Sequence, residues 1–317
     1  MKRSITNREY RLLEQLLSMQ ESSLVKALSK LLEKYYSQED IHATQDYIYT
    51  TGEIPVTLIA HLDTVLARPP QEIYHDPMSG VLWSPNGLGA DDRAGVFSII
   101  QLLERGYRPS VIFTTGEEIG GTGATKLTKD FSSPLVETLF LVELDRQGSQ
   151  DAVYYDCGNR DFESFITSFG FTTQLGSFSD ISIIGPAWDR ASVNLSIGYV
   201  NEHLMTEMLF YRDMFATIER VAQILDNYGN VIYDYQACKN DLFSNSFSAN
   251  LWICDCCMTP LTDKVEVVEY GLTTIYLCEA CAKRHVSKCK KCGREFLNPH
   301  LADKTNICED CKHEYEY

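Results

Sequence analysis

The sequence is short of cysteine over most of its length, short of positive charge throughout, and without long apolar runs. Only two of its 11 cysteines precede position 250, so disulfide bonds are not expected to support the main part of the chain. No stretch reaches the roughly 18 apolar residues that a membrane-spanning helix needs. The beginning of the chain is polar and has no apolar signal-peptide core. We therefore expect a cytoplasmic protein without a membrane partner.

The deficit of positive charge makes the chain strongly acidic. It contains 28 Lys and Arg residues against 44 Asp and Glu residues, and its formal net charge is −16. This balance argues against nucleic acid or anionic lipid as a general partner and favours cationic groups, such as a free amine. The apolar fraction of 44% is ordinary for a globular protein, and 317 residues allow one to three domains.

Short apolar runs alternate with helical periodicity as far as residue 229. Strands are expected at 55–63, 110–116, 138–145, 152–156 and 191–198, and helices at 7–36, 93–106, 123–131, 160–170 and 206–229. This alternation predicts an α/β fold with a mixed, mostly parallel sheet and helices on both faces. A polar, Ser- and Asn-rich stretch follows it. We therefore expect a domain over 1–240, a linker over 241–251 and a small module over 252–317.

Five polar clusters lie at the expected strand ends and helix starts, where ligands gather in open α/β sheets. They are His61-Leu62-Asp63, Asp91-Asp92, Glu117-Glu118, Glu143-Leu144-Asp145 and His203. Each cluster alone also has a structural explanation, such as the capping of a helix by an aspartate. Together they offer what a pair of metal ions needs: a bridging carboxylate, further ligands and a free base. The mixture of nitrogen and oxygen ligands suits zinc, with cobalt or manganese as alternatives.

Residue spacing suggests some roles and leaves others open. Asp63 lies two residues beyond His61 on an extended chain, so its carboxylate can hold the imidazole in one tautomer. Of the adjacent Glu117 and Glu118, one can bind metal while the other stays free as a general base. In the segment 143–145 both acidic residues share one face of the strand, so either can be the ligand.

The motifs AHLDTV, GADDRAG, TTGEEIGG, ELD and NEH, in this order, resemble the co-catalytic two-zinc exopeptidases. That family includes bacterial leucyl aminopeptidases, glutamate carboxypeptidases and peptidase T, and the resemblance covers approximately residues 40–230. It implies that one zinc ion is bound by His61, Asp91 and Asp145. It implies that the second is bound by Asp91, Glu118 and His203.

The resemblance also implies supporting roles and a reaction. Glu117 would be the general base, Asp63 would support His61, and the peptide bond between Asp91 and Asp92 would be cis. The implied function is the hydrolysis of amide or peptide bonds by a metal-activated water, in an aminopeptidase or dipeptidase that acts on small peptides. Two alternatives stay open. One is a deacylase or other amidohydrolase that takes acyl amides at the same site. The other is a catalytically inactive relic that serves as a binding or adaptor protein through its tail.

Some family members insert a lid domain between the fourth and fifth ligands. Here that interval is 58 residues (203 − 145), which is too short for such a domain beside the remaining strands and helix. The Ser-Asp pair before the last strand resembles the aminopeptidase branch. It makes Asp180 a candidate substrate-binding residue, although a plain turn residue is an equal alternative. Tyr199 is a second candidate, because it could replace the lid histidine that polarises the substrate.

The end of the chain carries paired cysteines with zinc-binding spacing. The expected ligands are Cys254, Cys257, Cys278 and Cys281 for one ion, and Cys289, Cys292, Cys308 and Cys311 for another. Each set forms a closed, structural four-thiolate site, and two such ions let a short segment fold without a large core. Cys256 competes for the first position. The arrangement resembles tandem treble-clef or LIM-like fingers.

The same tail contains an expected hairpin and a basic stretch. The segment 264–278 predicts two strands that turn at Gly271. The segment 283–294 holds six Lys or Arg residues in twelve, a pattern that also occurs in nucleic-acid-binding proteins. In such an acidic chain we favour a structural role for this stretch or a contact with a protein partner.

The two sets of ligands predict about four zinc ions per chain, two in the main domain and two in the tail. Elemental analysis of the purified, zinc-saturated protein measures this number directly. Chelators should remove the first pair more readily, because a catalytic site keeps an open position. A saturated sample with only two ions would show that either the main domain or the tail does not bind its predicted pair.

Overall fold

The computed structural model describes residues 3–237, 265–270, 273–279, 282–283, 286–293 and 295–297. The chain divides into two units, Met1–Lys239 and Asn240–Tyr317, and each is described by itself. None of the helices in the described ranges is long and apolar enough to cross a membrane.

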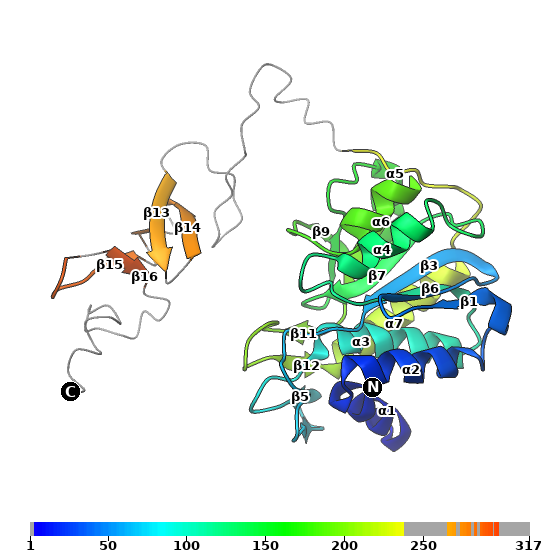
Figure 1. Ribbon diagram of the computed structural model, residues 1–317, viewed down its shortest axis with the longest axis horizontal. Helices are drawn as coiled ribbons and strands as arrows, with labels where there is room; N and C mark the ends of the chain where they lie inside the picture. Colours follow the sequence, from blue (N-terminus) through cyan, green and yellow to red (C-terminus); the bar gives the residue numbers. More distant parts are fainter. Residues whose placement is uncertain are drawn as a thin grey trace, which may run out of the picture. The chain divides into compact units, whose positions relative to one another are not determined.

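An eight-stranded mixed sheet, in the order β1-β2-β6-β3-β7-β10-β8-β9, is the framework of the first unit (Figure 1). The central strands, which run parallel, are β6 (Pro109–Thr114), β3 (Ile54–His61), β7 (Leu141–Arg146) and β10 (Ser192–Ser196). The outer strands are β1 (Ile41–Ala43), β2 (Tyr47–Thr50), β8 (Asp151–Val153) and β9 (Thr172–Gln174). The predicted α/β class and mixed sheet are confirmed.

Helices cover both faces of this sheet, because the side chains of its central strands alternate between two cores. Leu58 of β3 packs in the larger core, and the next residue, Ile59, packs in the smaller one. The larger core receives side chains from α1 (Asn7–Ser18), α2 (Glu21–Leu32), α3 (Ala90–Glu104), α5 (Arg160–Thr167) and α7 (Tyr211–Asp226). The smaller core receives them from α4 (Thr122–Asp130) and α6 (Ile181–Trp188). Figure 1 shows α3 and α7 on one side of the sheet and α4 and α6 on the other.

Two predicted helices have different boundaries in the structure. The helix expected at 7–36 is divided into α1 and α2, because Met19 and Gln20 both adopt extended backbone conformations. The helix expected at 206–229 begins only at Tyr211. Before it, Met208–Phe210 forms the short strand β12, in which Leu209 is buried and its two neighbours are partly exposed. This alternation is typical of a strand with one buried face and outweighs the helical periodicity.

Strand β12 belongs to a second, four-stranded sheet of order β11-β12-β5-β4. Its other members are β11 (Tyr199–Val200), β5 (Val81–Trp83) and β4 (Tyr74–Asp76). Because β12 leads directly into α7, this small sheet fixes the loop between β11 and β12 relative to the main domain.

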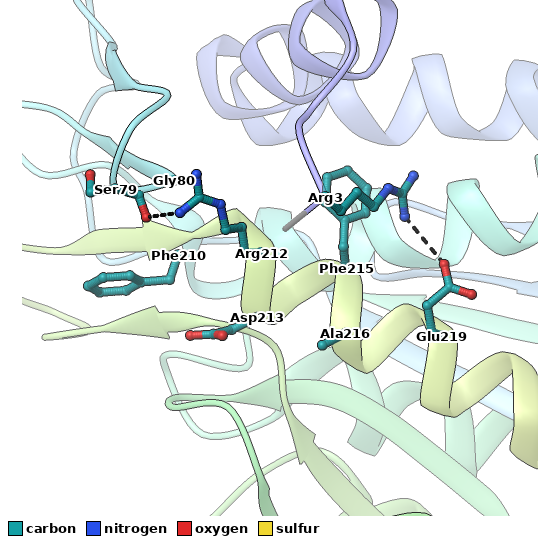
Figure 2. Close-up of a pocket in the computed structure, with 9 residues that line it drawn as sticks. All are labelled: Arg3, Ser79, Gly80, Phe210, Arg212, Asp213, Phe215, Ala216 and Glu219. Carbon is teal, nitrogen blue, oxygen red and sulfur yellow. Dashed lines mark hydrogen bonds and ion pairs between the residues drawn. The ribbon is translucent and has the colours of Figure 1, made fainter. Parts of the chain in front are cut away.

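Helix α7 is also joined to the beginning of the chain. The guanidinium of Arg3 lies 3.6 Å from the ring centroid of Phe215 and 3.4 Å from a carboxylate oxygen of Glu219 (Figure 2). One turn earlier, Arg212 donates hydrogen bonds to the backbone carbonyls of residues 77–79. These contacts connect α7 with both the amino-terminal segment and the second sheet. The side chains of Arg3, Arg212, Phe215 and Glu219 help to line a cavity of about 480 Å³.

After α7 the segment 231–237 crosses back over the domain and stays attached to it. The backbone N–H of Tyr233 donates to the carbonyl of Leu139, and the carbonyl of Tyr233 accepts from Ala191. The Tyr233 ring lies 5.3 Å from the ring centroid of Phe162. The chain thus remains part of the first unit well beyond its last helix.

The second unit contains two antiparallel strand pairs among its described residues. The first pair, β13 (Val265–Tyr270) and β14 (Thr273–Cys278), confirms the predicted hairpin, although Gly271 itself lies outside the described residues. The second pair is β15 (Val286–Lys288) and β16 (Glu295–Leu297). Cys278 ends β14, Cys289 is buried and Cys292 is exposed. The linker 241–251 and the remaining cysteines of interest lie outside the described residues; these are Cys254, Cys256, Cys257, Cys281, Cys308 and Cys311.

The attachment of residues 231–237 predicts where the chain can be shortened. A fragment that ends at residue 239 should fold cooperatively and bind metal. A fragment that ends at residue 230 should unfold at a temperature lower by about 5 °C or more, because it loses the aromatic contacts of Tyr233. Thermal unfolding by circular dichroism compares the two. Equal stability would show that the segment contributes nothing, and an insoluble longer fragment would show that the first unit depends on the tail.

Candidate metal centre

Three parallel strands and the start of α3 bring the predicted metal ligands to one edge of the sheet. Strand β3 ends at His61, β6 is followed by Glu117–Glu118, and β7 contains Asp145. Asp91 lies in the first turn of α3, and His203 lies in the loop between β11 and β12. Residues from five separate parts of the chain therefore meet at the carboxyl ends of the strands, as expected for an open α/β sheet.

The side chains form two groups that share Asp91. In the first group, Nε2 of His61 lies 3.1 Å from Asp91 Oδ1 and 3.2 Å from Asp145 Oδ1. In the second, Nε2 of His203 lies 3.2 Å from Asp91 Oδ2 and 2.9 Å from Glu118 Oε2. Within each group the ligand atoms lie within 4.8 Å of one another. Asp91 thus presents one oxygen to each group.

The chemistry of these groups fits metal ions. Carboxylates brought this close repel one another unless a cation lies between them. Glu118 Oε1 is buried and has no hydrogen-bond partner among the residues that the structure describes, which leaves an acceptor for a ligand. A third group of His61, Glu117 and Glu118 satisfies the same distance limit, so Glu117 also lies next to the cluster.

Asp63 fixes the turn that carries the two glutamates. Its carboxylate oxygens accept hydrogen bonds from the backbone N–H groups of Glu117 and Glu118, at 3.2 and 3.1 Å. Nδ1 of His61 lies 3.1 Å from the backbone carbonyl of Asp63 and 3.5 Å from its carboxylate. Gly116 begins the turn with φ of +70°, and a Cβ there would lie 2.0 Å from a threonine hydroxyl oxygen. Asp63 therefore positions both groups: its backbone carbonyl lies nearest the imidazole, and its carboxylate holds the glutamate pair.

Glu207 holds the shared aspartate, and sequence reasoning missed this role. Its carboxylate accepts hydrogen bonds from the backbone N–H groups of Gly89 and Asp91, at 2.6 and 2.9 Å. Burial raises the pKa of Glu207 to about 7. The expected cis peptide bond between Asp91 and Asp92 is confirmed. The only signal for Glu207 in the sequence is an acidic residue just before the short apolar segment Met208–Phe210.

Asp145, and not Glu143, lies in the cluster. The carboxylate of Glu143 is fully buried and accepts a hydrogen bond from the hydroxyl of Ser179. Asp145 is held by Asn194, whose side chain exchanges hydrogen bonds of 2.9 and 3.1 Å with the backbone of Asp145. The hydroxyl of Tyr199 donates to Asp145 Oδ1 at 3.1 Å. Asn194 was also missed, and its signal is an amide inside an apolar strand.

The two candidate substrate-binding residues are both buried. Asp180 accepts a hydrogen bond from Thr114, and its Oδ1 would lie 3.1 Å from a Cβ added to Gly121. It therefore packs beneath the turn that carries the glutamates, and burial raises its pKa to about 7. Tyr199 is only 2% exposed and contacts the cluster through Asp145. Direct contact of either residue with a substrate stays a prediction.

Burial shapes the protonation of the cluster. It raises the pKa of Glu117 to about 8 and that of Glu118 to about 7. Burial also opposes the ionisation of Asp91. Hydrogen bonds from His203 and His61 outweigh this effect and hold the pKa of Asp91 well below its ordinary value. The hydrogen bond to Asp91 raises the pKa of His203 to about 9.

Known proteins share this fold at low sequence identity. No protein-family model and no curated protein sequence matches the chain. The aminopeptidase PepT of Bacillus cereus superposes with a TM-score of 0.53 and 14% identity, over 70% of this chain and 98% of that one. A tripeptidase of Staphylococcus aureus gives 0.52 and 13%, over 70% and 98%. A TET aminopeptidase of a marine-sediment Thaumarchaeota archaeon gives 0.55 and 12%, over 70% and 97%. The first unit therefore has the fold of these peptidases.

The raised pKa values predict how the stability of the metal-free protein depends on pH. The contributions of Glu117 and Glu118 are complete below their ordinary pKa of 4.5 and are lost as the pH rises through about 7 to 8. His203 acts in the same direction, since its contribution is complete below 6.5 and lost through about 9. Asp91 has the opposite sign, but its contribution is lost only in acid, outside this window.

The unfolding temperature of the chelator-treated protein should therefore fall between pH 6 and pH 9, by about 5 °C or more. Added Zn²⁺ should remove most of this fall, because a cation stabilises the ionised carboxylates. Differential scanning fluorimetry across this range, with and without Zn²⁺, measures both effects. A metal-free protein that becomes more stable from pH 6 to pH 9 would contradict the raised pKa values of Glu117, Glu118 and His203.

Proposed function

We propose that the protein is a two-zinc peptidase that acts on short peptides, as an aminopeptidase or dipeptidase. The observation that carries the proposal is the pair of ligand groups joined by Asp91. A carboxylate that presents one oxygen to each of two groups is the arrangement that a dinuclear centre requires. The fold shared with aminopeptidases and a tripeptidase supports the same class of reaction.

The residues for the two ions follow from the groups. One ion would be held by His61, Asp91 and Asp145, and the other by Asp91, Glu118 and His203. Zinc suits this mixture of imidazole and carboxylate ligands, and cobalt or manganese could replace it. Bound there, the ions would supply a water of lowered pKa and polarise the scissile carbonyl.

Glu117 is the proposed general base. It lies beside the cluster without belonging to either of the groups that share Asp91. Its backbone N–H is fixed by Asp63, so its carboxylate has a defined position next to Glu118. There Glu117 can accept a proton from water and return it to the leaving amine, and a pKa raised toward neutrality favours both transfers.

The surroundings of the cluster favour the amino end of a peptide. The carboxylates attract a free amine. Four exposed apolar residues lie one or two positions after cluster residues in the chain, at 48 to 77% exposure; they are Val65, Ile119, Leu204 and Met205. A substrate whose first residue has an apolar side chain therefore suits these surroundings best. We propose that the enzyme prefers apolar first residues.

The tail has a separate proposed role. We propose that its eight paired cysteines hold two structural zinc ions and that it contacts a protein partner. Cys289 is buried directly after β15, whereas Cys292 is exposed. A cytoplasmic location, where thiols stay reduced, suits the cysteine ligands of the tail.

Substitution of the two glutamates separates base from ligand. Glu117→Gln should retain both catalytic ions and lose hydrolysis by roughly 10²- to 10⁴-fold, because an amide of the same shape cannot accept the proton. Glu118→Gln should lose one ion as well as activity. Metal content and the kcat of a leucyl peptide are measured for both variants.

A matched pair of substrates, one with a free amino terminus and one acetylated, tests the class of reaction. The free amine should be preferred. Preference for the acetylated compound would identify a deacylase, and near-normal turnover by Glu117→Gln would show that the base is another residue.

A further inference from the structure

A cavity lies between the α1–α2 junction and the loop after β3. Its volume is about 410 Å³, within the range of about 300–1,000 Å³ that small-molecule sites occupy. Two of its lining residues are Thr64, which follows Asp63 in the chain, and Gly89, which lies two residues before Asp91. Gly89 is also tied to Asp91 through the carboxylate of Glu207. The cavity therefore adjoins the cluster.

Arg93 is the only cation among the residues that line this cavity, all of which the structure describes. Its side chain is almost completely buried, with 4% exposure. Nη1 donates a hydrogen bond of 3.3 Å to the carbonyl of Leu16, near the end of α1. The buried Nε has no hydrogen-bond partner within the described part of the chain. An unused donor on a buried charge is costly unless a ligand satisfies it.

The charges around Arg93 leave its guanidinium open to a ligand. An arginine guanidinium stays protonated in proteins, so Arg93 is charged at neutral pH. Glu21, Asp63 and Asp92 attract it electrostatically, but within the described residues none of them forms an ion pair of 4.0 Å or less with it. The planar guanidinium fork matches a carboxylate, which accepts two parallel hydrogen bonds.

We infer that this cavity binds the free α-carboxylate of a short peptide, with Arg93 as the binding residue. The inference rests on the proposed peptidase function and specifies its substrate class. The acidic cluster attracts the amino end of the peptide, and Arg93 binds its carboxyl end. A long chain cannot place its first peptide bond at the cluster and its terminal carboxylate in the adjoining cavity. The substrates are therefore dipeptides or tripeptides with an unmodified carboxyl terminus.

Two peptides that differ only at the carboxyl end test the inference. L-leucylglycine and L-leucylglycinamide are titrated by calorimetry into the zinc-loaded full-length protein that carries Glu117→Gln, which prevents turnover. The free acid should bind about 10- to 100-fold more tightly than the amide, as expected for hydrogen bonds to a charged group. Equal binding of the two peptides, or no binding of either, would overturn the inference without the need for any variant at Arg93.

Variants then assign the preference to Arg93. Arg93→Met should abolish the preference for the acid, whereas Arg93→Lys should keep part of it, since an ammonium retains the charge without the fork. Lys26→Met is the matched control: it removes an exposed cation from α2 that lines a different cavity, and it should leave the preference unchanged. Thermal unfolding verifies that each variant is folded. A full preference for the acid in the folded Arg93→Lys and Arg93→Met proteins would exclude Arg93.

Hydrolysis by the parent protein separates this inference from the proposed function. If the acid binds preferentially but neither peptide is cleaved, the peptidase proposal fails and the carboxylate site stands. If both peptides are cleaved with equal kcat/KM and bind equally, the peptidase stands and the carboxylate site is wrong.

Discussion

The burial of several carboxylates around one shared aspartate is the constraint on which the rest of the structure depends. Like charges in a region of low solvent access raise one another's pKa and oppose folding unless cations or hydrogen bonds compensate them. Asp91 lies at the centre of the cluster, because one of its carboxylate oxygens faces His61 and the other faces His203. Its backbone is held by Glu207, so even the support of the cluster is acidic.

This arrangement requires several segments to be placed accurately. Asp63 ties the end of β3 to the turn after β6, and Asn194 ties β10 to Asp145 in β7. These hydrogen bonds cross between neighbouring parallel strands at the edge where the cluster lies. The second sheet and α7 place the remaining histidine. The second sheet and α7 therefore position a ligand that the central sheet itself cannot supply.

Much of this could be predicted from sequence, because parallel strands bring their carboxyl ends to one edge. His61, Asp145 and the Glu117–Glu118 pair meet for that reason alone. Glu207 and Asn194 could not be predicted, since their partners are backbone groups whose positions depend on the folded loops. In the segment 143–145, strand geometry left two candidates, and only the contact of Glu143 with Ser179 distinguishes them. The break in the first helix was missed because both halves carry the same leucine periodicity. Residues at this break line the cavity that contains Arg93.

The two histidines of the cluster differ in their freedom to move. The side chain of His61 is 1% exposed at the end of a central strand, whereas that of His203 is 52% exposed on a loop with left-handed backbone. The proposed dinuclear centre would therefore combine a rigid half with an adjustable half. In the proposed centre, the ion held by His203 would therefore be more accessible to solvent than the ion held by His61. The proposed hydrolysis would then depend on the occupancy of that exposed position.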